Sequence, residues 1–241
     1  LLIAAPSLWL IRSAKMNFRE TLSLKPFKFS AIPISLLFIM ACFFINLWIG
    51  GMTQKVMPES GMDMKRLEKV LEPVLTNMSW IWILIVFGLA PGICEEILFR
   101  GFLLSGFMEN KKKWQAVLMV GICFGLFHLY PAKYFTTGFM GIVLALIVLK
   151  TGSIYPAMIA HAFNNSFLML LSQVINPESS VGKVTFDFLQ KYGQGDVLLP
   201  LYYVVPAVIV ALLCYKWLPH AVAEPSLPKT TLPKENLEKN V

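Results

Sequence analysis

Several apolar stretches in this chain are long enough, or nearly long enough, to cross a lipid bilayer, which takes about 20 residues of helix. They cover residues 29–49, 77–108, 114–129, 134–149, 154–171 and 197–217. Of all residues 56% are hydrophobic and only 15% are charged, whereas soluble domains have about 25% charged residues. The sequence therefore predicts an all-α, polytopic membrane helix bundle of about six membrane helices.

The basic residues lie between the apolar stretches, and they account for the net charge of +7. A positive-inside bias explains this placement, and no basic patch interleaved with aromatic residues indicates nucleic-acid binding. The bias puts residues 12–28, 111–113, 150 and 216 onward on the cytoplasmic side, and residues 51–76, 130–133 and 172–196 on the opposite side. We expect a multi-pass integral membrane protein.

Three regions follow from these patterns: a basic N-terminal connector over residues 1–28, a membrane domain over 29–217 and a disordered cytoplasmic tail over 218–241. The apolar run 1–11 is too short to span, so we interpret it as the end of a truncated preceding region. Helical spacing predicts a short interfacial helix within residues 52–76 and another around 181–191. The four cysteines are scattered singly in apolar runs, which is typical of small buried residues.

Breaks in the apolar stretches are predicted at glycine and proline. Gly50 and Gly51 are expected to end the first membrane helix at Ile49. Pro91 and Gly92 are expected to divide the long stretch 77–108 into two helices. Pro206 is expected to kink the last helix.

Two adjacent carboxylates, Glu95 and Glu96, lie in one of the most apolar parts of the sequence. An ionised carboxylate at bilayer depth costs roughly 2.5–3.5 kcal/mol on insertion scales, so a functional role is the first hypothesis for both. Glu96 and Arg100 share a helix face at i,i+4 spacing, which predicts a structural ion pair. Glu95 points about 100° away from that face and is left to face a cavity.

The other polar groups in apolar helices are His128, His161 and the pair Asn164 and Asn165. Counted from the lysines at the helix ends, Glu95 and His128 lie roughly 22–25 Å deep and His161 roughly 16 Å deep. Helix tilt can absorb the difference, so a common site is predicted. Within the helices, His161 shares a face with Asn165, and Phe124 is expected to pack beside the imidazole of His128.

The motifs Glu95-Glu-x-x-x-Arg100, Phe124-x-x-x-His128 and His161-x-x-x-Asn165, in this order on successive apolar helices, carry a family likeness. They resemble the CAAX protease and bacteriocin-processing (CPBP, or Abi) family of intramembrane proteases, which includes the Ras-converting CAAX endopeptidase. The likeness covers roughly residues 80–215.

The resemblance implies a hydrolase, a glutamate-type intramembrane endopeptidase of the bacterial cytoplasmic membrane. By motif position, Glu95 is the general base that activates water, and His128 helps to hold that water. His161 and Asn165 stabilise the oxyanion, and Glu96, Arg100 and Phe124 support the site. The implied partners are the lipid bilayer, a membrane-associated or lipidated peptide substrate, and a transporter permease that some family members are fused to.

Alternatives stay open at this point. A zinc-dependent form of the same peptidase would use Glu95, His128 and His161 as ligands with water in the fourth position, although a cofactor-free site is the favoured interpretation. A non-catalytic membrane scaffold or immunity protein would use the polar groups only to lock helices together. A proton-coupled transporter would use them as a relay, but no inverted repeat supports it.

Overall fold

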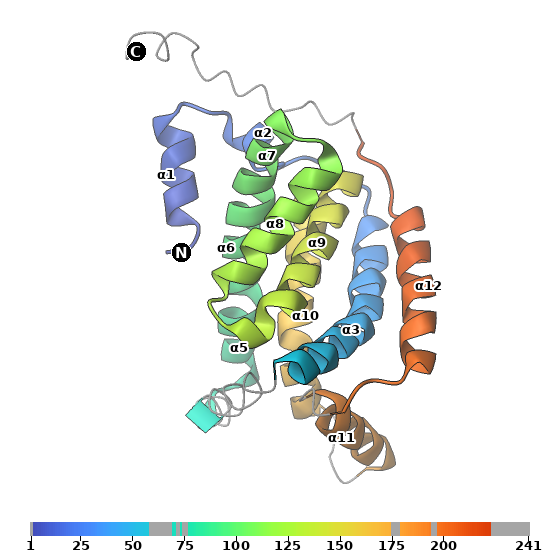
Figure 1. Cartoon of the computed structure of the whole chain (residues 1–241). Coiled ribbons are helices and arrows are strands. Elements are labelled where there is room, and N and C mark those ends of the chain that lie inside the picture. The colour runs from blue at the N-terminus through green and yellow to red at the C-terminus, as the bar shows by residue number, and fades with distance from the viewer. Residues whose placement is uncertain are drawn as a thin grey trace.

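The structure is a computed structural model, and it describes residues 2–57, 69–70, 73, 77–174, 179–193 and 197–222. All regular structure in these residues is helical, and long helices lie side by side to form a bundle (Figure 1). The main helical segments of the bundle are α3 (Ala31–Val56), the run from α5 (Trp80–Ile83) to α7 (Leu104–Asn110), α8 (Lys113–Phe127), α9 (Tyr134–Thr151), α10 (Tyr155–Val174) and α12 (Leu201–Trp217). The predicted all-α bundle is confirmed.

Three helical stretches of the described residues are long and apolar enough to cross a membrane: Ala31–Val56, Trp80–Asn110 and Tyr134–Thr151. Lys113–Phe127 and Leu201–Trp217 are shorter apolar helices. α10 is 20 residues long and carries the polar residues His161, Asn164 and Asn165 in its apolar sequence. The chain is an integral membrane protein. The polar side chains that lie within its apolar helices are concentrated on few of those helices.

The connectors predicted to share one side of the membrane lie at the same end of the bundle, the upper end in Figure 1. Hydrogen bonds tie them together. Ser105 Oγ donates to the carbonyl oxygen of Thr21 at 2.7 Å, and the Ile154 N–H donates to that of Ser23 at 3.1 Å. The Ala221 N–H donates to the carbonyl oxygen of Lys150 at 3.1 Å.

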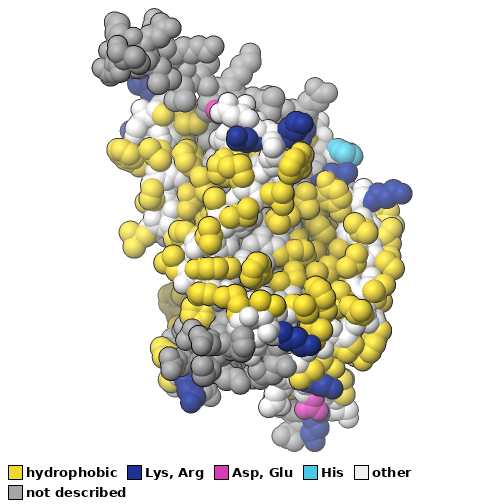
Figure 2. All heavy atoms as spheres, viewed as in Figure 1, with side chains coloured by type: hydrophobic (Ala, Val, Ile, Leu, Met, Phe, Trp, Pro, Cys, Tyr) yellow, Lys and Arg dark blue, Asp and Glu magenta, His cyan; other side chains and the backbone are white. Residues whose placement is uncertain are grey.

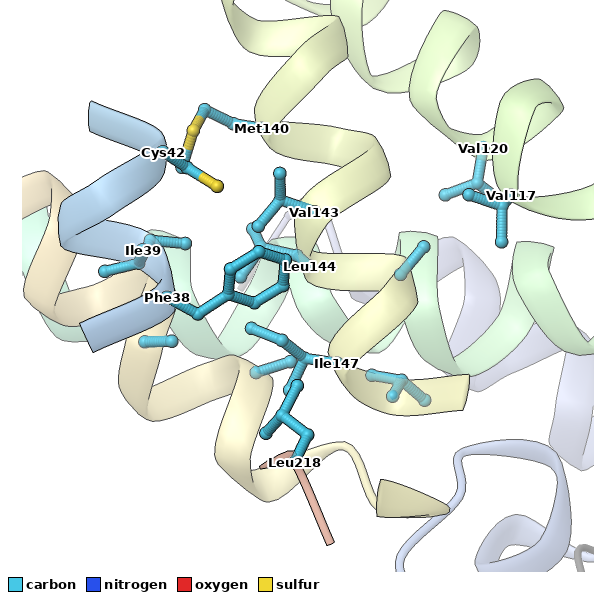
Figure 3. Close-up of a cluster of buried hydrophobic side chains, with 14 of the residues drawn as sticks. Phe38, Ile39, Cys42, Val117, Val120, Met140, Val143, Leu144, Ile147 and Leu218 are labelled. Carbon is cyan, nitrogen blue, oxygen red and sulfur yellow. The ribbon is translucent and has the colours of Figure 1, made fainter. Parts of the chain in front are cut away.

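The hydrophobic core is centred on α9. Figure 3 shows Phe38, Ile39 and Cys42 of α3 beside Met140, Val143 and Leu144 of α9. From α8, Val117 and Val120 belong to the same cluster of buried side chains. This core fixes α9 between α3 and α8, and α10 packs against α3, α6 (Ala90–Glu96) and α9.

Backbone contact joins α8 to α9. A Cβ on Gly121 would lie 3.0 Å from the carbonyl oxygen of Gly138, and a Cβ on Gly141 would lie 3.0 Å from Cα of Gly121. Small residues let helices approach this closely in membranes. We call this contact the glycine seam.

The predicted end of the first membrane helix at Ile49 is wrong, because α3 continues through Gly50 and Gly51 to Val56. Gly51 serves close packing instead. A Cβ on Gly51 would lie 3.3 Å from Cα of Leu198, in the segment that precedes α12. A close neighbour, rather than a turn, accounts for glycine at this position.

The predicted division of residues 77–108 at Pro91 is also wrong, because Trp80–Asn110 is one continuous helix. The π-helical segment η1 (Leu84–Leu89) ends just before α6 (Ala90–Glu96), which has Pro91 in its first turn. In an α-helix, the ring of Pro91 would press on the carbonyl group four residues earlier. A wider π-helical turn relieves that contact, and it lets the helix continue.

The remaining segments lie outside the bundle centre. α1 (Ala5–Ser13) and α2 (Phe18–Thr21) lie in the N-terminal connector, and α11 (Ser180–Gly193) is the short helix predicted before the last crossing. Much of the helix predicted within 52–76 falls outside the described residues, as does the tail from 223 onward. Before that point, Leu218 is buried in the main core.

Candidate active site

Both glutamates lie at the end of α6, which packs closely against α10. Gly92 makes this approach possible. A Cβ at Gly92 would lie 3.0 Å from both the backbone nitrogen and Cβ of Ala162. Because Ala162 follows His161 directly, the contact at Gly92 places the imidazole beside the carboxylates.

Glu96 and Arg100 form a fully buried ion pair. Arg100 Nη1 donates to Glu96 Oε1 at 2.7 Å, and both side chains are 0% exposed. Arg100 Nη2 also donates to the carbonyl oxygen of Gly141 on α9 at 3.2 Å. The i,i+4 pair is the one that the spacing predicts, and it also connects the glutamate helix to α9. Arg100 lies within the π-helical segment η2 (Ile97–Leu103).

His161 lies between the two carboxylates. Its Nδ1 is 2.8 Å from Glu96 Oε1, and its Nε2 is 3.8 Å from Glu95 Oε2. Glu95 is 13% exposed at its side chain, whereas Glu96 is completely buried. Glu96 therefore has a role that the sequence did not reveal, because it orients the histidine as well as pairing with Arg100.

Phe124 forms a shared wall for the cluster. Its ring centroid lies 4.3 Å from Arg100 Cζ, 5.0 Å from the His128 ring and 5.8 Å from the His161 ring. His128 Nδ1 lies 2.9 Å from the carbonyl oxygen of Phe124, which leaves Nε2 as the other hydrogen-bonding nitrogen of that ring. Phe124 thus packs beside His128, as the spacing predicts, and it also contacts the second histidine.

Asn165 lies one helical turn beyond His161 on α10 and is partly buried. Its Oδ1 accepts a hydrogen bond from Asn164 Nδ2 at 3.3 Å. Its amide nitrogen is therefore the group that can donate to a bound molecule. Among the described contacts, Asn165 does not join the hydrogen bonds between Glu96 and His161.

The structure thus joins Glu95, Glu96, Arg100 and His161 directly, and it connects His128 to them through Phe124. The contributions of Gly92 and of the Gly141 carbonyl could not be found from the sequence, because each depends on which helices are neighbours.

Within the described protein, Glu96 Oε2 and Arg100 Nε have no hydrogen-bond partner. A buried cluster with unpaired polar atoms is costly, which favours a functional over a purely structural role.

The residues of the zinc alternative show a mixed fit. Both ring nitrogens of His161 face carboxylate oxygens, and the Phe124 ring contacts both histidines. In the described part of the chain, no three His, Cys, Asp or Glu side chains are grouped as a metal site. In a zinc ligand set of Glu95, His128 and His161, Nε2 of His161 would be the ligand, and Glu96 would hold the Nδ1–H of the same ring, so the contact with Glu96 is compatible with zinc.

Residues 77–167 match the family described as type II CAAX prenyl endopeptidase Rce1-like. The family resemblance is confirmed. The matched range contains every residue of the cluster, from Glu95 on α6 to Asn165 on α10.

A curated relative, the candidate membrane peptidase YdiL of Bacillus subtilis (strain 168), is 25% identical over 144 residues. The aligned region covers 58% of this chain and 58% of YdiL, so the chain spans little more than half of that relative. No solved structure gives a match. The Rce1-like resemblance therefore rests on the helices that carry the site.

Proposed function

We propose that this chain is an intramembrane endopeptidase that hydrolyses a peptide bond of a membrane-associated substrate with a water activated by Glu95. The observation that carries the proposal is the meeting of Glu95, Glu96 and His161 between α6 and α10. The Rce1-like match supports a CAAX-like substrate. A leader or bacteriocin-type peptide is the other substrate class.

Burial and charge separate the roles of the two glutamates. Arg100 compensates the charge of Glu96, and neither side chain is exposed. Glu95 is the partly exposed acid, and its contact with His161 is a looser 3.8 Å. A general base must reach the water that it deprotonates, so Glu95 is the base and Glu96 is a positioning residue.

In the proposed reaction, Glu95 accepts a proton from water while the resulting hydroxide attacks the scissile carbonyl carbon. The carbonyl π electrons move to oxygen and form a tetrahedral oxyanion. Collapse of this intermediate breaks the C–N bond, and Glu95 returns the proton to the leaving amine. His128 Nε2 helps to hold the water before attack.

Neutral or positive donors aimed at the oxyanion supply much of the rate enhancement in such reactions, roughly 3–4 kcal/mol each. The amide nitrogen of Asn165 is one such donor. Since Nδ1 of His161 faces Glu96, Nε2 is the nitrogen that remains for the reacting groups. When both nitrogens of His161 carry protons, Nε2 donates to the oxyanion and Glu96 balances the charge of the ring.

The test is a comparison of membrane peptides in cells that produce the wild type, Glu95→Gln or Glu109→Gln. We expect new peptide termini with the wild type and a loss of about 100-fold or more with Glu95→Gln, the usual contribution of general base catalysis. Glu109 is an exposed glutamate near the end of the same continuous helix, so Glu109→Gln is the matched control.

Retained peptide termini with Glu95→Gln would contradict the proposal and favour the scaffold or immunity alternative.

A bacterial cytoplasmic membrane is the proposed location, and association with a transporter permease is a further proposal from the family resemblance. Cofactor-free catalysis is favoured over the zinc form because no three His, Cys, Asp or Glu side chains of the described residues are grouped as a metal site.

A further inference from the structure

A groove of about 550 Å³ opens between α8, α9 and the end of α12, away from Glu95 and Glu96. Its polar rim contains Lys113, Lys150 and His220, and Leu118 and Leu146 contribute to an apolar wall. Tyr215 lines the groove between these parts, with its ring centroid 5.2 Å from Lys150 Nζ. The groove thus has a cationic end and an apolar end.

The cationic end has no compensating acid among the residues that the structure describes. All lining residues are basic, aromatic or aliphatic. The described ion pairs involve neither Lys113 nor Lys150. Two lysines at one groove therefore present positive charge to whatever enters it.

The groove opens where α8 begins and where α9 and α12 end. Trp114, which lines the groove at the start of α8, and Trp217, at the end of α12, are each 60% exposed. Exposed tryptophan and lysine at helix ends mark the membrane–water interface. Figure 2 shows basic side chains gathered at the two ends of a broad hydrophobic surface, which is the pattern expected around a bilayer.

We propose that this groove binds an anionic phospholipid. The phosphate lies between Lys113 and Lys150, His220 lies at its edge, and an acyl chain follows Leu118 and Leu146. Basic pockets between membrane helices bind acidic headgroups in this manner. A free phosphate would leave the apolar wall uncovered, and a zwitterionic headgroup would bring a cation toward the lysines.

Such a lipid would hold together three elements. The segment after α12 is already fixed here, since the Ala221 N–H bonds to the carbonyl oxygen of Lys150. The lipid adds a bridge from this segment and α9 to the first turn of α8. The site is therefore a structural lipid site, and its occupancy can be measured without any assay of hydrolysis.

The experiment is native mass spectrometry of the purified full chain with phosphatidylglycerol or phosphatidylcholine of identical acyl chains. We expect stronger binding of phosphatidylglycerol by the wild type. Lys113→Gln combined with Lys150→Gln should weaken that binding by roughly 10- to 30-fold, from the attraction that each lysine supplies to anionic lipid.

The matched control combines Lys111→Gln with Lys112→Gln, two exposed lysines that do not line the groove. This control removes two positive charges, as the groove variant does. Its affinity for phosphatidylglycerol should stay within about threefold of the wild type, because exposed surface charges are screened. Equal binding of both lipids by the wild type would overturn the proposal. An equal loss in both double variants would also overturn it, because that indicates attraction by the surface as a whole.

Discussion

At the residue scale, Glu95 and Glu96 are neighbours with different surroundings. Glu96 is enclosed by Arg100 and His161, both within 2.8 Å of its Oε1. Among the ion pairs of the described residues, Glu95 faces only Nε2 of the same histidine, at 3.8 Å. Glu96 is thus fixed within the structure, whereas Glu95, one position earlier in the helix, is the partly exposed carboxylate that the proposed substrate would reach.

We expect Glu96→Gln to lower thermal stability sharply. Removing one partner of a buried ion pair costs about 3–5 kcal/mol, because the other charge is left uncompensated, and this lowers the melting temperature by on the order of 10 °C. Glu95→Gln should change the melting temperature by much less. Melting of both purified variants in detergent measures this difference.

The opposite pattern would reverse the assignment of the two glutamates. If Glu96→Gln keeps the melting temperature of the wild type and loses all hydrolysis, while Glu95→Gln is harmless, then Glu96 is the base. The buried pair with Arg100 would in that case be a catalytic arrangement rather than a structural one.

Chelation separates the cofactor-free and zinc forms of the proposed peptidase. We expect hydrolysis to survive a strong chelator, because the attacking water is proposed to be activated by Glu95 and not by a metal ion. Elemental analysis of the purified protein should then find far less than one zinc per chain. Loss of hydrolysis on chelation, with recovery on added zinc, would support the alternative ligand set instead.

Contacts within one helix could be predicted from the sequence, and contacts between helices could not. The pairs Glu96–Arg100 and Phe124–His128 follow from i,i+4 spacing. Which glutamate faces His161 depends on how α10 is rotated against α6, and spacing does not determine that rotation. The bond from Arg100 to the Gly141 carbonyl likewise depends on the placement of α9.

At the element scale, Gly51 and Pro91 mark close packing and a widened turn, whereas Gly152 ends α9 in a left-handed conformation. α3 continues through Gly50 and Gly51, and the helix that carries the glutamates continues through Pro91. A sequence shows the breaker residue but not the neighbour that requires a glycine, nor the π-helical turn that accommodates a proline. The predicted helix types were therefore more accurate than the predicted boundaries.

Gly92→Ala should reduce hydrolysis more than any loss of stability explains. The added methyl group meets the backbone of Ala162 at 3.0 Å, so α6 must move away from α10 and from His161. Overpacking of this kind costs about 1–3 kcal/mol, offset in part by the better helix propensity of alanine, about 0.5–1 kcal/mol. Parallel measurements of turnover and melting temperature test the expectation.

Gly106→Ala is the matched control, because it lies on the same continuous helix and its Cβ would meet no atom within 4 Å. We expect it to leave turnover unchanged and to raise the melting temperature slightly. Equal activity in the two variants would show that the approach of α6 to α10 does not position the catalytic groups.

At the scale of the whole molecule, charge counting placed the connectors correctly relative to one another. The connectors with excess lysine share one end of the bundle, and hydrogen bonds such as that from Ser105 to Thr21 join them. The end that faces the cytoplasm remains a prediction from the positive-inside rule.

Single-cysteine labelling tests that orientation. Lys112→Cys and Asp187→Cys place exposed thiols at opposite ends, on the connector before α8 and on α11. In intact cells, we expect an impermeant thiol reagent to label position 187 and to spare position 112. Of the four native cysteines, three are buried and Cys123 is partly buried, so they give a low background. Labelling at position 112 alone would invert the predicted topology.

The glycine seam limits how a substrate can reach Glu95. A peptide that arrives from the lipid phase needs two neighbouring helices that can part sideways. Between α8 and α9 the backbones approach closely at the glycine seam, and the side chains of Ile142 and Phe124 pack against the same glycines, so this boundary leaves little room for a path. Under the proposed chemistry, the entrance lies at a different helix boundary, and α8 and α9 form the closed side of the enzyme.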